Sequence, residues 1–385
     1  MRFVLSLLIG LMFGQNPLLG DTLYTVTDIG SLEGNSTSGT SLNNAGQVTG
    51  SSIISEGASH AFLYSDGRMT DLGTLGGLSS TGAGINNSGQ ITGTADTSDG
   101  FSHAFLYNNG VMADLGTLSR DRYSGGNAIN DSGQVTGFSA FAQRPDLSNP
   151  THAFLYTGGQ MRILGTLDGN DGGGTAINNQ GQVAGYSVSS DGTQRAFVFM
   201  NDQRTDLGTL GGRVTGASGI NELGQVVGTS RTEIALADHA FLYADGRLTD
   251  LGTLPAPFSS GSPASSSARD INDSGQVVGS SQIFFRGNFH AFLYTNGSMI
   301  DLNDLIDPAL GIALSAATAI NDQGQILANG VRGANNFGSA YLLTPAANVV
   351  PEPHRLPILG LALVGAFSLL GRLRKGLCSQ SLARL

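Results

Sequence analysis

The chain has 385 residues, of which 57 are glycine and only 12% are charged, and it contains no tryptophan and one cysteine. Its formal net charge of −10 argues against a nucleic-acid-binding protein, because such proteins need a basic surface to displace counterions from phosphates. The single cysteine, Cys378, excludes an internal disulfide and a cysteine-rich metal site.

The first predicted element is an apolar segment at the amino terminus. Met1 to Gly20 has one basic residue, Arg2, then an apolar run from Phe3 to Phe13, and it ends on a small residue. This order is typical of a secretion signal peptide, so residues 1–20 are expected to be removed. The alternative, a buried first strand or helix, fits less well because the repeats that follow are complete without this segment.

Three short phrases then recur seven times each, at a spacing of 43 to 51 residues. The phrase I-N-x-x-G-Q-V-x-G begins at Leu42, Ile85, Ile129, Ile177, Ile220, Ile271 and Ile320. The phrase H-A-F-L-Y begins at His60, His103, His152, Arg195, His239, His290 and Ser339. The phrase D-L-G-T-L begins at Asp28, Asp71, Asp114, Ile163, Asp206, Asp250 and Asp301. A period of this size indicates a solenoid or a propeller.

Each repeat is predicted to form four short antiparallel strands, which we label A to D. In the fifth repeat, Asn221 and Gly224 supply one hairpin turn, and Asp245-Gly246 supplies another. Neighbouring residues of H-A-F-L-Y point to opposite faces and all are apolar, as expected for a sheet that is packed between two others. Sheets arranged around a common axis meet that requirement.

The order of the phrases predicts how the ring closes. The first D phrase, from Tyr24 to Leu32, precedes every A strand, whereas the last unit, from Ala316 to Leu343, lacks a D strand. We therefore expect an all-β, seven-bladed β-propeller of four-stranded antiparallel blades spanning residues 21–345, in which the N-terminal strand completes the last blade. An open β-solenoid is the alternative fold, and it would not require the two ends to complement each other.

The loops predict where a ligand would bind. The A–B and C–D turns are nearly constant in length, whereas the B–C and D–A loops, which emerge on the opposite face, vary. The longest are residues 140–150, 255–266 and 306–315. Loops on a rigid scaffold concentrate binding residues. The best-equipped side chains on this face are Phe141, Arg144, Asp146 and Phe258.

No metal site or cofactor is expected. Five of the six histidines occupy the first position of H-A-F-L-Y, and equivalent positions in different blades are too far apart to bind one ion. We expect these histidines to bond to a nearby turn or to an aspartate of strand D, although no strict pair in every blade is predicted. The sequence N-D-S-G, at Asn130 and Asn272, resembles a fragment of a calcium loop but lacks its spaced oxygen ligands, and the segment from Asp168 to Gly172 is a slightly better calcium candidate.

No catalytic residues are predicted either. The sequence has no G-x-S-x-G elbow, phosphate-binding loop, H-E-x-x-H motif or Cys-His pair. Acids from separate loops remain able to meet above the axis, so the enzyme question stays open.

The carboxyl-terminal segment, residues 346–385, is predicted to be a linker and a membrane-facing tail. Val350-Pro351-Glu352-Pro353 precedes an apolar run from Leu356 to Gly371, which is followed by a basic cluster. The run is a little shorter than the hydrocarbon core of a bilayer, and the basic residues would stay in the cytoplasm. A buried core helix is the alternative.

The three phrases resemble the extracellular HAF repeat family, over residues 24–344. That resemblance implies a secreted bacterial protein with repeat architecture and leaves the activity open. The tail resembles the PEP-CTERM sorting signal, which implies that an exosortase-type enzyme recognises Pro351, Glu352 and Pro353 and releases or attaches the protein at the outer surface of a Gram-negative cell. Two features depart from that signal: His354-Arg355 follows the motif directly, and residues 376–385 extend beyond the basic cluster.

Three functions are compatible with these observations. The first is a non-catalytic surface or matrix scaffold that binds an extracellular glycan or an envelope protein, and that touches the membrane only through its tail. The second is an enzyme that acts on extracellular polysaccharide through loop carboxylates such as Asp146. The third is a structural coat component without a discrete ligand.

Overall fold

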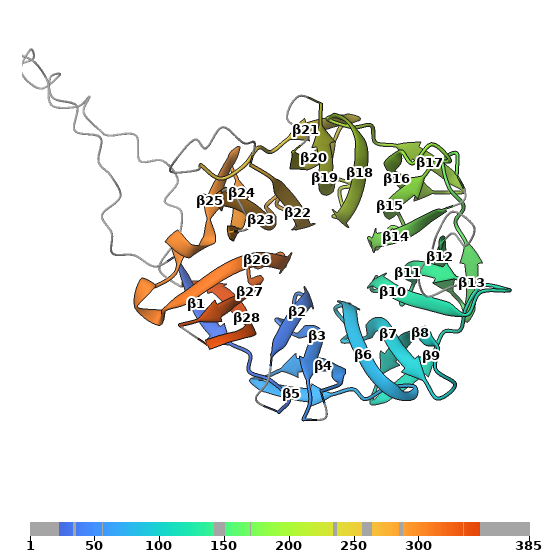
Figure 1. Ribbon diagram of the computed structural model, residues 1–385, viewed down its shortest axis with the longest axis horizontal. Helices are drawn as coiled ribbons and strands as arrows, with labels where there is room; N and C mark the ends of the chain where they lie inside the picture. Colours follow the sequence, from blue (N-terminus) through green and yellow to red (C-terminus); the bar gives the residue numbers. More distant parts are fainter. Residues whose placement is uncertain are drawn as a thin grey trace, which may run out of the picture. The chain divides into compact units, whose positions relative to one another are not determined.

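The computed structural model describes residues 23–33, 36–55, 57–141, 151–169, 171–233, 237–255, 264–284, 288–333 and 335–346. Within them the chain forms antiparallel sheets that surround a central axis (Figure 1). Five sheets have four strands, and one has eight. The eight-stranded sheet consists of two antiparallel four-stranded groups that are joined by a single parallel pair, Gln194 with Val214.

The strands alternate in direction within each group, in the chain order A to D. The A strands are β2 (Thr37–Leu42), β6 (Gly76–Ile85), β10 (Tyr123–Ile129), β14 (Asp171–Ile177), β18 (Gly211–Ile220), β22 (Ser266–Ile271) and β26 (Ile312–Ile320). The B strands are β3 (Val48–Ile53), β7 (Ile91–Thr97), β11 (Val135–Ala140), β15 (Val183–Val188), β19 (Val226–Thr232), β23 (Val277–Phe284) and β27 (Ile326–Arg332).

The outer strands complete each sheet. The C strands are β4 (Ser59–Ser65), β8 (Ser102–Asn108), β12 (Thr151–Thr157), β16 (Gln194–Met200), β20 (Asp238–Ala244), β24 (Asn288–Thr295) and β28 (Asn335–Pro345). The D strands are β5 (Arg68–Asp71), β9 (Val111–Asp114), β13 (Gln160–Ile163), β17 (Gln203–Asp206), β21 (Arg247–Asp250), β25 (Ser298–Asp301) and β1 (Tyr24–Asp28). Two short 3₁₀ helices, η1 (Leu302–Leu305) and η2 (Pro308–Leu310), follow β25.

Strand β1 lies in the same sheet as the last three strands of the chain. It pairs antiparallel with β28, from Tyr24 opposite Pro345 to Asp28 opposite Tyr341. The sheet therefore has the order β1, β28, β27, β26, and the segment that begins the described chain pairs with the segment that ends it. The expectation of an all-β chain built from four-stranded antiparallel sheets is confirmed.

The core lies between neighbouring sheets. One cluster combines Ala104 of β8 with Ile129, Val135 and Phe154 of the next sheet, and other clusters repeat this arrangement around the axis. The second and third residues of H-A-F-L-Y are almost completely buried in every repeat; those at the third position are Phe62, Phe105, Phe154, Phe197, Phe241, Phe292 and Tyr341. This burial confirms that both faces of each C strand are covered, as the apolar pattern predicts.

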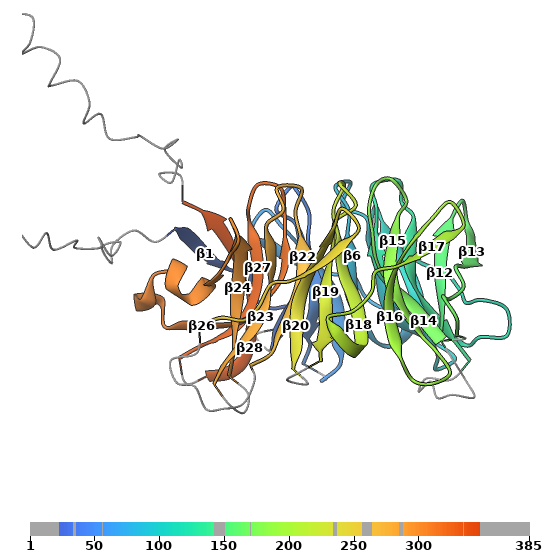
Figure 2. The ribbon, with the colours of Figure 1, turned by 90° about the horizontal axis from the view of Figure 1, so that it is seen from above.

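The strands run between two opposite sides of the ring (Figure 2). We call the side with the A–B and C–D turns the turn side and the side with the B–C and D–A connections the loop side. Every A–B turn has the same geometry, in which the glycine N–H donates to the asparagine carbonyl of I-N-x-x-G. The turn side is therefore uniform, and the differences between repeats gather on the loop side.

Candidate functional site

One of the four predicted binding residues is placed by the structure. Phe141, at the loop-side end of β11, is 49% exposed, and the Arg122 guanidinium lies 5.4 Å from its ring centroid. The same guanidinium lies 5.8 Å from the ring of Phe101. Phe141 is therefore part of an exposed group that combines aromatic rings with a guanidinium, and its role in binding stays a prediction.

The other predicted residues lie outside the described residues. They are Arg144, Asp146 and Phe258 of the loops, and Pro351, Glu352 and Pro353 of the tail. The segments predicted to be a signal peptide and a membrane-facing helix also lie there. Within the described ranges, no helix has the length and apolar character needed to cross a membrane.

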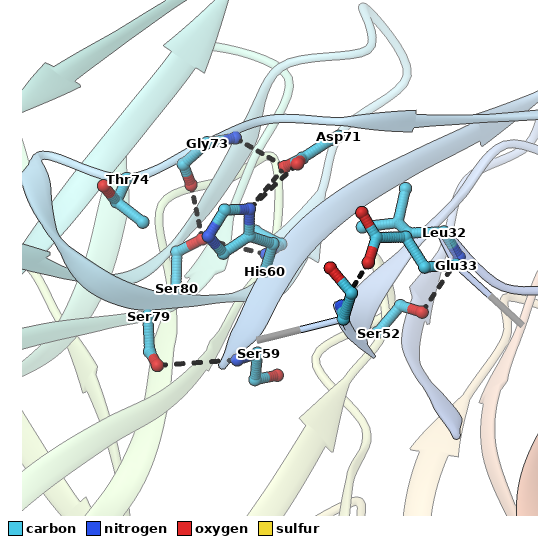
Figure 3. A network of polar contacts seen from close by, with 12 residues as sticks. Leu32, Glu33, Ser52, Ser59, His60, Asp71, Gly73, Thr74, Ser79 and Ser80 are labelled. Atoms are coloured by element: carbon cyan, nitrogen blue, oxygen red, sulfur yellow. Dashed lines mark hydrogen bonds and ion pairs between the residues drawn. The ribbon is translucent and has the colours of Figure 1, made fainter. Parts of the chain in front are cut away.

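The histidines bond mostly to the D-strand aspartates of their own sheets. The Nδ1 atom of His60 lies 2.8 Å from Asp71 Oδ2, and Asp71 Oδ1 accepts the Gly73 N–H at 2.8 Å (Figure 3). Equivalent pairs form in three other sheets, with His103, His239 and His290. His152 instead lies 3.3 Å from Asp121, because its own D strand ends in Ile163, where the other sheets have the aspartate. The expected contact between these histidines and D-strand aspartates is confirmed in four sheets.

Backbone groups beside these pairs connect neighbouring sheets. The Gly73 carbonyl accepts the hydroxyl of Ser80, from the next A strand (Figure 3). That hydroxyl in turn accepts the Ala61 N–H. The H-A-F-L-Y and D-L-G-T-L phrases are therefore parts of one repeated contact between sheets. In the part of the chain that the structure describes, no group of three or more His, Cys, Asp or Glu side chains is placed to hold a metal ion.

A large cavity opens on the loop side, across three consecutive sheets. It has a volume of about 880 Å³. Its lining combines hydroxyls, an amide, an imidazole, a guanidinium, a carboxylate and an exposed aromatic ring, and includes Ser265, Ser266, Ser267, Arg269, Asn288, Phe289, His290, Asp238 and Ser315. Phe289 is 40% exposed. We call this cavity the β22–β26 cleft, and sequence reasoning did not identify Phe289 as one of its residues.

The wall of the axial channel departs from the repeat pattern beside this cleft. The residue before the isoleucine of I-N-x-x-G is small in six repeats, but in the sixth repeat it is Asp270, and Arg269 precedes it. Both line a channel of about 230 Å³, and Arg269 also lines the cleft. Asp270 accepts the N–H of Ile271 and the N–H of Ile320 in the next sheet, each at 2.9 Å.

Burial raises the pKa of Asp270 to about 6, and the nearby Asp322 carboxylate adds to the increase. The two backbone donors lower the pKa but do not offset the effect of burial. A carboxyl whose pKa is higher in the folded state binds more protons there than in the unfolded chain. The protonated form is therefore favoured by folding. This group's contribution to the free energy of unfolding must increase as the pH falls from about 6 toward 4.

We expect replacement of Asp270 by alanine to remove this pH dependence. Alanine occupies the equivalent position in three other repeats, at Ala128, Ala176 and Ala319, so the variant should fold. Between pH 7 and pH 4 the wild type should gain about 1–2 kcal/mol of free energy of unfolding that the variant does not gain, after allowance for solvent screening. Urea unfolding of both proteins at four pH values measures the difference, and parallel pH profiles would contradict the assignment.

The turn side carries two rings of hydrogen bonds that sequence reasoning did not foresee. In the first ring, each buried asparagine of I-N-x-x-G donates from Nδ2 to the carbonyl of the equivalent asparagine in the next repeat, at 2.9–3.1 Å. The ring runs through Asn43, Asn86, Asn130, Asn178, Asn221, Asn272 and Asn321 and returns to Asn43.

The second ring uses the residue after each of these asparagines. Its backbone N–H donates to a side-chain oxygen of the equivalent residue in the next repeat, at 2.8–3.1 Å. The members are Asn44, Asn87, Asp131, Asn179, Glu222, Asp273 and Asp322. All of them have a side-chain oxygen that can accept, which explains the residue types at this position. The acids of this ring therefore have a structural use.

Comparison with known proteins gives a partial family match and a common fold. A family model described as "Protein of unknown function (DUF3466)" matches residues 174–340. No match to a curated protein was found. Among solved structures, the β-propeller domain of the trilobed protease from Pyrococcus furiosus, described as having an open velcro topology, is similar with a TM-score of 0.52 and 7% identity. The match covers 80% of this chain and 95% of that one.

Two further structures show comparable similarity. An oligogalacturonate lyase in complex with manganese has a TM-score of 0.54 and 11% identity over 84% of this chain and 97% of that one. An acylaminoacyl peptidase from Pyrococcus horikoshii has a TM-score of 0.52 and 10% identity over 80% of this chain. The chain spans about half of that peptidase, 51% of its length. At these identities the similarity shows the fold alone, and it confirms the predicted β-propeller class.

Proposed function

We propose that the protein is a closed seven-bladed β-propeller that serves as a non-catalytic binding scaffold for an extracellular glycan. Closure is supported by two observations. Strand β1 pairs with β28, so one sheet contains both ends of the described chain. The ring of asparagine hydrogen bonds passes through all seven repeats and returns to its start, with Asn321 donating to the Asn43 carbonyl at 3.1 Å.

The observation that carries the glycan proposal is the lining of the β22–β26 cleft. Sugar rings present apolar C–H faces and many hydroxyls, so they bind surfaces that combine an aromatic ring with several hydrogen-bonding groups. In the cleft, Phe289 offers the ring, and the serine hydroxyls, Asn288 and Arg269 offer donors and acceptors. Polysaccharides can span several subsites, and a cleft open to one side of the scaffold suits an extended chain.

The enzyme alternative has less support in this cleft. A glycosidase needs two carboxyl groups about 5–9.5 Å apart across the bond that breaks. Among the described residues that line the cleft, Asp238 carries the single carboxylate, and it pairs with Arg231 at 3.0 Å. The coat-component alternative requires no cleft at all.

We also propose that the protein acts outside the cell. Residues 1–20 would direct secretion, and the tail around Pro351, Glu352 and Pro353 would be processed by an exosortase-type enzyme at the surface of a Gram-negative bacterium. A transient or retained membrane anchor follows from the same tail. Extracellular polysaccharide or an envelope protein would then be the available partner, and no nucleic-acid partner is proposed.

Replacement of Phe289 by alanine tests the cleft. We expect the full-length protein to bind at least one polysaccharide in a panel of bacterial exopolysaccharides, and the variant to bind it at least tenfold more weakly, about 1.4 kcal/mol. Phe141→Ala, on another sheet of the loop side, is the matched control and should keep wild-type affinity. Binding and released oligosaccharides are measured together.

Each outcome separates the functions. Binding without products supports the scaffold, whereas released products support the enzyme. The absence of both supports the coat component. Weakened binding in Phe141→Ala with unchanged binding in Phe289→Ala would move the site from the cleft to the predicted loop beside β11.

A further inference from the structure

A second, smaller cavity lies on the loop side of the fourth repeat. Its volume is about 350 Å³. Its lining is polar except for one leucine and comprises Leu167, Asp168, Ser189, Ser190, Asp191, Thr193, Arg195 and Asp206. We call it the Arg195 pocket. It shares no lining residue with the β22–β26 cleft.

The pocket exists where the fourth repeat departs from the pattern. Arg195 replaces the first histidine of H-A-F-L-Y, and its Nη1 atom donates to Asp206 at 3.2 Å, as a histidine would to the same aspartate in other sheets. A guanidinium has five N–H donors, so this pairing leaves others to serve the pocket. The Arg195 side chain is 40% exposed, which places part of it within reach of a ligand.

Asp191 contributes a fixed acceptor to the same lining. Asp191 Oδ1 accepts the Ser189 hydroxyl at 2.6 Å and the Thr193 N–H at 2.9 Å, and Oδ2 accepts from Thr193 Oγ1 and from Arg213. These bonds, that of Ser189 most strongly, hold the pKa of Asp191 at about 2, so the carboxylate is ionised above pH 3. Its side chain remains 63% exposed and can accept further bonds.

We propose that the Arg195 pocket binds one residue of a neutral sugar, an inference that rests on the proposed glycan-binding function but concerns a separate place. A hydroxyl both donates and accepts, whereas a carboxylate only accepts and a guanidinium only donates. Adjacent sugar hydroxyls therefore satisfy Asp191 and Arg195 together, with Asp168 as a further acceptor. Leu167 provides an apolar surface for C–H groups.

The charges select against other small ligands. Three carboxylates and one guanidinium line the pocket, so an anionic sugar would meet net repulsion. A bare metal ion would meet the guanidinium inside the site and would lose the carboxylate of Asp206, which that guanidinium holds. A neutral polyhydroxyl ligand is repelled neither by the carboxylates nor by the guanidinium.

Arg195→His in the full-length protein is the decisive variant. Histidine is native at this position in five other repeats, so folding should be retained, and a matching thermal unfolding midpoint verifies it. We expect the methyl pyranosides of glucose, galactose and mannose, titrated one by one, to include at least one that binds the wild type with a Kd of about 1 mM. Arg195→His should weaken that binding at least tenfold, and Asp191→Asn should weaken it also.

The controls separate this pocket from the cleft. Phe289→Ala should leave binding of the pyranoside unchanged. If polysaccharide binding depends on Phe289 while no pyranoside binds, or while Arg195→His binds it as tightly as wild type, the pocket assignment is wrong and the cleft stands. Calcium binding that is lost in Asp168→Asn and kept in Arg195→His would equally overturn the sugar assignment. Pyranoside binding that follows Arg195 supports it even if the cleft proves inactive.

Discussion

Replacing Gly228 with alanine should lower the free energy of unfolding by about 3–4 kcal/mol. A Cβ atom at Gly228 would lie 2.0 Å from the carbonyl oxygen of Gly216 on the paired strand. That carbonyl belongs to the backbone and approaches because β18 carries a bulge between Ala217 and Gly219, so that two of its residues oppose one of β19. Relief of the overlap requires separation of the two strands.

The same pair of strands supplies the control. Alanine at Gly216 would place its Cβ 3.0 Å from the Gln194 amide, the flexible end of a side chain, and Gly216→Ala should cost less than about 1 kcal/mol. Guanidinium unfolding monitored by circular dichroism measures both variants. Equal stabilities of the two variants would show that the bulge does not restrict Gly228.

The seventh repeat shows what accommodation of a side chain requires. Ala328 occupies the position of Gly228 there, and its partner strand β26 has a second bulge, between Leu314 and Ala316. The close approach then falls on Gly330 instead, whose Cβ would lie 2.3 Å from the Ala313 carbonyl. The second register shift of β18 lies farther away, between Gly211 and Thr215, so Gly228 keeps the close approach and its substitution is expected to be costly.

Local patterns made much of the fold predictable. The alternation of short apolar segments and N-x-x-G turns defines the strands, because each turn is completed by residues four apart, as in the bond from the Gln225 N–H to Asn221 Oδ1. The displaced D phrase near Tyr24 predicted the pairing of β1 with β28. The first inference depends on residues that are close in sequence, and the second depends on the number and order of the phrases. Both can be read from the sequence directly.

Contacts between repeats were not accessible in the same way. The pattern at Asn178 is satisfied by its own hairpin, so nothing in the sequence required the second bond to Asn221 of the next repeat. The use of acids such as Asp131 and Asp322 as ring acceptors was hidden for the same reason. When a residue bonds both within its own hairpin and to the next repeat, the sequence pattern reveals only the bond within the hairpin.

The candidate sites could be predicted from the sequence only in part. Arg195 and Asp270 stand out when the repeats are aligned position by position, so a comparison of the repeats would have marked them as departures. The β22–β26 cleft is different, because its lining comes from three sheets and Phe289 belongs to no repeated phrase. Loop length predicted a binding site on the loop side, where this cleft also opens, but it gave no information on which side chains line the cleft.

The second large effect is expected in the asparagine ring. The substitution Asn178→Ala should lower the free energy of unfolding by about 3 kcal/mol. The side chain is 3% exposed. Its Nδ2 donates to the Asn221 carbonyl at 3.0 Å and to Gln182 Oε1 at 2.7 Å, while its Oδ1 accepts the Gln182 N–H at 3.0 Å. Alanine leaves these partners without their bonds in a buried place, and each such group costs roughly 1–3 kcal/mol, reduced where channel water can replace the side chain.

Asn108→Ala is the control, because Asn108 is exposed at the end of β8 and should tolerate the change within about 0.5 kcal/mol. Urea unfolding gives both values.

The ring adds a second readout, since Asn178 connects the fourth repeat to the fifth. Hydrogen exchange in Asn178→Ala should quicken in β14 and β18, the two strands that the lost bond joins, more than in β2 on the distant part of the ring. Uniform acceleration around the ring would show that the asparagine bonds stabilise the whole scaffold rather than each junction separately.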